Sequence, residues 1–70
     1  MNAETLRELL RRQPFEPFEI RMTNGDVHLI RHPESVLIIG SRAVVGFPET
    51  EGLAILSLLH ITAIEMPEAV

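Results

Sequence analysis

Few residues of this chain could do chemistry, because its 70 residues include three histidines and no cysteine. The lack of cysteine excludes disulfides, Cys-ligated zinc, iron–sulfur clusters and thiol nucleophiles. His28 and His32 are four residues apart, a spacing at which two side chains could share a metal ion in a helix. In an extended strand, the same spacing separates them by roughly 13 Å. We therefore predict no metal site and no cofactor.

The serines, acids and glycines also lack a catalytic arrangement. No serine has a G-x-S-x-G context, no aspartate lies at an informative spacing from a histidine, and the four glycines form no phosphate-binding loop. The sequence therefore predicts a protein that is not an enzyme. His60 is the histidine best placed for a role, in a tight turn between two apolar segments. It could pack at the edge of the core and bond to the backbone, or it could belong to a ring of histidines around an oligomer axis.

Charge is unevenly distributed along the chain. The formal net charge is −4, and all six basic residues are arginines. Residues 1–31 hold five arginines and five acids, whereas residues 32–70 hold Arg42 and five glutamates. The chain as a whole is thus unlike a basic nucleic-acid-binding protein. An anion site would need a local arginine cluster in the N-terminal half, and the alternative is that these arginines are solvated surface residues.

Residues 3–12 are expected to form one short amphipathic helix. Its apolar stripe, spaced i, i+3, i+4, consists of Leu6, Leu9 and Leu10. Asn2 can cap the first turn, and Pro14 ends the helix because the residue before a proline is pushed out of the helical conformation. A helix of three turns is marginal in water, so the stripe must dock on the rest of the chain.

A β-hairpin is expected over residues 18–31, where apolar and polar residues alternate on both sides of Asn24-Gly25. Asn-Gly is the preferred two-residue type I′ turn. Such a turn predicts the cross-strand pairs Thr23–Asp26, Met22–Val27, Arg21–His28 and Ile20–Leu29. In this register the apolar pairs share one face of the hairpin.

The rest of the chain is expected to form further strands of a single domain that spans residues 1–70. Pro33 should bend the second strand, because proline cannot donate to a strand ladder. Later strands are predicted at residues 36–39, 43–47, 53–58 and 61–66. An acidic loop at 48–52 and a tight turn at Leu59-His60 separate the last three, and residues 67–70 form a short tail.

Three segments of the chain resemble the Sm-like family, in particular its bacterial Hfq-type branch. They are Leu9-Leu10-Arg11-Arg12, the segment Pro17–Gly25, and His60-Ile61-Thr62-Ala63-Ile64. The resemblance implies an α+β, mainly β fold: the helix at 3–12, then a five-stranded, strongly bent antiparallel barrel of SH3-like type over residues 18–66. One long bent strand would then run from Asp26 to Ile39. The chain is also similar to short bacterial proteins of unassigned function that share a Phe-x-Pro-Phe-x-Ile start and a His-Pro-Glu bend.

The same resemblance implies a ring in which the penultimate strand of one copy pairs with the last strand of the next. It also implies RNA contacts from Arg11 and Arg12 at the rim and from His60 at the pore. The chain departs from the family at Leu58 and Leu59, where relatives carry an aromatic residue and a lysine that touch RNA. We therefore expect the fold and the assembly to carry over better than RNA binding.

Two segments, Val36–Ile39 and Leu53–Leu58, would be apolar on both faces of a strand. In a strand with one face in water, apolar and polar residues should alternate. One helix cannot cover both, so we expect a homo-oligomer, a ring or dimer, formed through edge strands. The expected interface residues are Leu53, Ile55, Leu56, Leu58, Ile61 and Ile64.

The function that follows is a protein-interaction or structural module, with an RNA-binding, RNA-chaperone-like module as the alternative. A net charge of −4, multiplied in an assembly, favours the first. Residues 1–14 contain no apolar segment typical of a signal peptide. The apolar stretch 53–64 is too short to span a bilayer and is interrupted by polar residues. A cytoplasmic location without membrane contact is expected.

Overall fold

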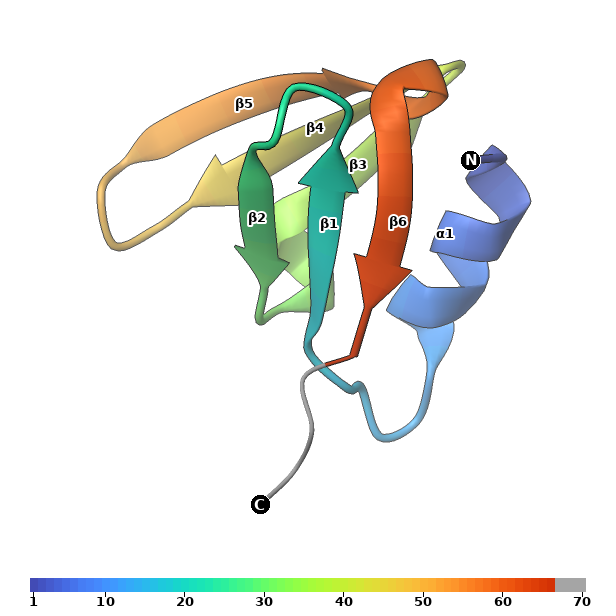
Figure 1. Cartoon of the computed structure of the whole chain (residues 1–70). Coiled ribbons are helices and arrows are strands. Elements are labelled where there is room, and N and C mark those ends of the chain that lie inside the picture. Colours follow the sequence, from blue (N-terminus) through green and yellow to red (C-terminus); the bar gives the residue numbers. More distant parts are fainter. Residues whose placement is uncertain (67–70) are drawn as a thin grey trace.

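The computed structural model describes residues 1–66, and the expected tail at 67–70 lies outside them. Two three-stranded antiparallel sheets, in the orders β2-β1-β6 and β3-β4-β5, form the body of the protein, and α1 lies beside them (Figure 1). The elements are α1 (Ala3–Arg11), β1 (Phe18–Met22), β2 (Val27–Ile30), η1 (Pro33–Ser35), β3 (Val36–Ile39), β4 (Arg42–Phe47), β5 (Gly52–Ser57), η2 (Leu58–His60) and β6 (Ile61–Glu65).

The expected five-stranded barrel is wrong. Residues 1–66 form a small α+β fold with six strands in two separate sheets, and these sheets do not join into a closed barrel. The segment from Asp26 to Ile39 is not one bent strand, because the 3-10 turn η1 interrupts it at Pro33. Since proline has no N–H to continue a ladder, the chain leaves the first sheet at this turn and enters the second as β3. The turn η2 returns it to the first sheet as β6.

The helix matches its sequence signals closely. It ends at Arg11, one residue before the expected end, and Asn2 caps it by accepting a hydrogen bond from the Thr5 N–H at 2.8 Å. Leu6 is fully buried, so the expected docking of the apolar stripe is confirmed. Within the described part of the chain, no helix is long and apolar enough to cross a membrane.

The expected hairpin is present, but its register differs by one residue. Ile20 lies opposite His28 rather than Leu29, and Arg21 lies opposite Val27. A one-residue shift moves side chains to the other face of the second strand. Val27 and Leu29 therefore point outward and are exposed, whereas Ile30 enters the core.

The core lies between the two sheets and α1. Alternate residues of β1 and β4 point into it, which explains their alternating burial. Its fully or nearly fully buried members are Leu6, Phe18, Ile20, Ile30, Ala43, Val45, Leu56, Leu58 and Ile61. This burial holds the two sheets against each other through one small apolar interior.

Candidate functional site

The arginines expected to contact RNA are engaged by carboxylates of the same chain. Arg11 Nη1 lies 3.6 Å from Glu4 Oε1, and Arg12 Nη1 lies 3.4 Å from Glu16 Oε2. All four side chains are more than 45% exposed, so each pair is weak and can open. A phosphate group would nevertheless meet a carboxylate beside each guanidinium.

His60 does not lie with the two arginines. Arg11 ends α1, whereas His60 ends η2, the turn between β5 and β6 at the top of the view, above the C-terminal end of α1 (Figure 1). The His60 side chain is exposed, and its backbone carbonyl accepts a hydrogen bond from the Thr23 N–H at 2.8 Å. Within one copy, the structure therefore forms no joint site from Arg11, Arg12 and His60.

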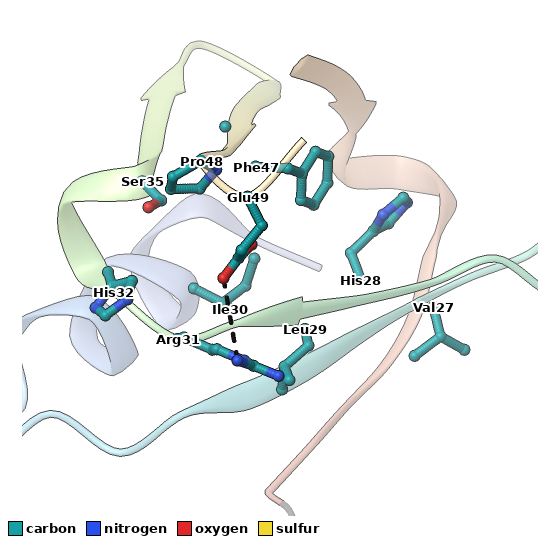
Figure 2. Close-up of a pocket in the computed structure, with 11 residues that line it drawn as sticks. Val27, His28, Leu29, Ile30, Arg31, His32, Ser35, Phe47, Pro48 and Glu49 are labelled. Carbon is teal, nitrogen blue, oxygen red and sulfur yellow. Dashed lines mark ion pairs between the residues drawn. The ribbon is translucent and has the colours of Figure 1, made fainter. Parts of the chain in front are cut away.

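Two hollows adjoin β2, and His28 lines both. The larger, about 580 Å³, lies between the β1–β2 turn and β5 and also includes His60. The smaller, about 320 Å³, lies between β2 and the end of β4 (Figure 2). There the His28 and Phe47 rings are 5.8 Å apart between centroids.

The smaller hollow has the minimum size of a small-molecule site. Its charged groups are directed at each other, since Arg31 Nη1 lies 4.0 Å from Glu49 Oε1 across the opening (Figure 2). In residues 1–66, no three His, Cys, Asp or Glu side chains gather closely enough to hold a metal ion. We therefore assign no reaction and no ligand to this hollow.

The six residues expected at an oligomer interface divide into two groups. Leu56, Leu58 and Ile61 are buried in the chain's own core, and Ile64 packs against that core. Leu53 and Ile55 point away from the core and are 67% and 64% exposed. Of the six, these last two are the ones with large, mostly exposed side chains.

The exposed leucine and isoleucine of β5 belong to a larger apolar surface that extends beyond the expected interface residues. In the sheet register, Leu37 lies opposite Val44, and Val44 lies opposite Ile55. Leu37 and Ile39 are 59% and 60% exposed. We call this outer surface of the second sheet the apolar face; its members are Leu37, Ile39, Val44, Leu53 and Ile55. In the sequence, the uninterrupted apolar run 36–39 indicated that the β3 part of the apolar face would be apolar on its outer side as well.

The outer side of the first sheet differs, because charged residues occupy it. Arg21 lies between two acids, with its Nη2 3.4 Å from Glu19 Oε1 and its Nε 2.6 Å from Glu65 Oε1. Two of these charged residues lie beside the exposed apolar residues of β2, with Arg21 opposite Val27 and Glu19 opposite Leu29. Of the two outer sheet surfaces, only the apolar face thus lacks a network of ion pairs among the described residues.

We compared the chain with family models, with curated proteins and with solved structures, and none of the three comparisons found a match.

Proposed function

We propose that this chain is a non-catalytic, self-associating interaction module of the cytoplasm that works through its apolar face. The observation that carries this proposal is the exposure of four large aliphatic side chains on one side of one sheet. The largest contiguous apolar patch of a soluble protein is often a functional surface. Scattered exposed leucines would carry no such inference.

The first sheet supports the same interpretation by contrast. It has the same number of strands, yet its outer side holds an arginine between two carboxylates, as expected of a surface in water. Charged side chains thus suit the outer side of the first sheet to contact with water. The outer side of the second sheet has no such ion pairs among the described residues, which favours a partner on that side.

The alternative function, RNA binding, has less support. Each of the two arginines proposed to contact phosphate is within 3.6 Å of a carboxylate. His60 lies on a different element, η2. The net charge of −4 also repels a polyanion at long range.

Light scattering after size-exclusion chromatography tests self-association. Measured over a hundredfold range of protein concentration, the average mass should rise from that of one 7.9 kDa chain to an integral multiple of it. A mass that stays at one chain up to millimolar concentration would contradict the proposal.

An anisotropy titration with labelled single-stranded RNA tests the alternative. We expect no binding even at low salt, where phosphate contacts are strongest. Binding that weakens with salt, with a slope reduced by Arg11→Ala and Arg12→Ala together, would instead favour the RNA-binding function. Arg31→Ala, at the exposed residue that follows β2, serves as the matched control.

A further inference from the structure

The apolar face contains no acidic residue, although the chain carries ten. The outward positions of β3, β4 and β5 include one charged residue, Arg42, which lies opposite Ile39 at one end of the sheet. A surface that is apolar and free of carboxylates can approach a second copy of itself without burying repelling acids. Self-association through this face therefore avoids the electrostatic repulsion that two chains of net charge −4 would meet if they associated through an acidic surface.

The area of the apolar face is sufficient for a small dimer. From their exposed fractions, its aliphatic side chains present roughly 500 Å² of apolar surface per copy, about a tenth of the 4853 Å² total. Two such surfaces bury roughly 1,000 Å², which is the lower size of a specific interface. A second copy thus matches the face in area as well as in polarity.

The charges at the two ends of the sheet indicate how the copies are oriented. Arg42 lies at one end, and Glu51 lies in the loop at the other end, just before Gly52. Neither makes an ion pair with another described residue. If the strands of the two copies run in opposite directions, each Arg42 approaches Glu51 of the partner subunit.

The register fixes the centre of this arrangement. Val44 lies in the middle of β4, between Leu37 and Ile55. A two-fold axis through Val44 and across the strands places Arg42 over Gly46 of the partner subunit. Gly46 has no side chain. The partner's Glu51 would then be offset from Arg42 by roughly 7 Å along the strands and roughly 5 Å across them, on a sheet roughly 10 Å away, so the two backbones would be roughly 13 Å apart. The long Arg42 and Glu51 side chains can span that separation together. A parallel orientation would instead bring the two Arg42 side chains together.

We propose that two copies of this chain pack their β3-β4-β5 sheets face to face, with Val44 against Val44 and opposite strand directions. The result is a β-sandwich dimer in which two equivalent Arg42–Glu51 pairs close the ends. This inference rests on the proposed self-association and adds its surface, its copy number and its orientation. Pairing of the β5 and β6 edges, which would build a ring, is the competing mode of assembly.

Cysteine cross-linking tests the geometry, because the natural chain has no cysteine. Under mild oxidation, Val44→Cys and, separately, Leu37→Cys should each form disulfide-linked dimers, since the axis brings each residue near its own copy. Leu59→Cys, at an 80% exposed position outside the face, should remain uncross-linked at the same concentration. Cross-linking of Leu37→Cys only when mixed with Ile55→Cys would indicate the parallel orientation and overturn the proposed one.

Charge reversal tests the ends of the interface. Arg42→Glu and Glu51→Arg should each weaken the dimer by about tenfold, because each replaces two attractive contacts with two repulsive ones. The double variant should restore most of the affinity, whereas Arg11→Glu should leave the dimer unchanged. Failure of the double variant to recover would overturn the Arg42–Glu51 contact.

Leu53→Asp separates this inference from the proposed function. It should abolish the dimer while the circular dichroism spectrum remains that of the folded chain, and Leu59→Asp should have no effect. If the natural chain associates and Leu53→Asp associates equally well, the face-to-face dimer is wrong although self-association stands. If the natural chain is monomeric throughout, both proposals fail.

Discussion

At the residue scale, the pairing of β1 with β2 depends on Gly25. Its φ is +94°, and its N–H donates to the Met22 carbonyl at 3.0 Å, while the Met22 N–H donates to the Asp26 carbonyl at 2.9 Å. A type I′ turn needs a positive φ at both central residues, and Asn24 does not have one. The loop therefore has three residues, which shifts the register by one.

Asn24-Gly25 thus predicted a turn but could not predict its length. The same two residues serve a two-residue type I′ loop and a three-residue loop with glycine in the left-handed position. The choice depends on what each register buries. Here the pairing of Phe18 with Ile30 places both side chains in the core. This additional apolar burial depends on the packing of the whole fold, so the turn sequence alone could not predict it.

We predict that Gly25→Ala lowers the free energy of unfolding by about 1 to 2 kcal/mol, because an L-residue is strained at this φ. Open space surrounds the position, so a clash contributes nothing. Gly46→Ala is the control: no left-handed φ is required there, and the nearest atom to the new Cβ would be Ser35 O at 3.9 Å. Urea unfolding at one low protein concentration measures both, and equal losses would contradict the strain argument.

At the element scale, α1 shows how a short helix is held. Its nine residues are too few for stability in water, so its attachment must come from packing. Leu6 is its one fully buried residue, while Leu9 and Leu10 are half-buried against the core. The sequence predicted this element well because the cap, the stripe and Pro14 are all local signals.

Leu6→Ala should therefore lower the free energy of unfolding by about 2 to 4 kcal/mol. This is a large part of the total of roughly 4 to 10 kcal/mol expected for a domain of this size. Alanine is a better helix former than leucine, so the loss reports packing and not helix propensity. Leu9→Ala, which removes the same atoms from a half-buried position, should cost clearly less. Urea unfolding of the two variants provides the comparison, and a similar loss from both would mean that Leu6 does not anchor the helix.

The strands were harder to predict than the helix, because strand pairing is not local. Proline at position 33 correctly predicted a break, but nothing in the sequence showed that β2 and β3 would join different sheets. The apolar runs 36–39 and 53–58 correctly predicted strands with two apolar sides. Which side faces outward was decided by the core, which takes Leu56 and leaves Leu53 and Ile55 exposed.

At the scale of the whole molecule, an exposed apolar face couples folding to assembly. A partner that binds only the folded chain stabilises it by mass action. The resistance of the natural chain to heat or urea should therefore rise with its own concentration. A monomeric domain shows no such dependence.

We predict that each tenfold increase in concentration above the dimer's Kd adds about 1.4 kcal/mol of stability per mole of dimer. Scanning calorimetry or thermal circular dichroism over three decades of concentration would measure this as a rising midpoint. Leu53→Asp should remove the dependence, because it places a carboxylate in the apolar face, whereas Leu59→Asp should retain it. A midpoint that is independent of concentration in the natural chain would mean that the apolar face stays in contact with water, and the exposed side chains of β3 and β5 would then need another explanation.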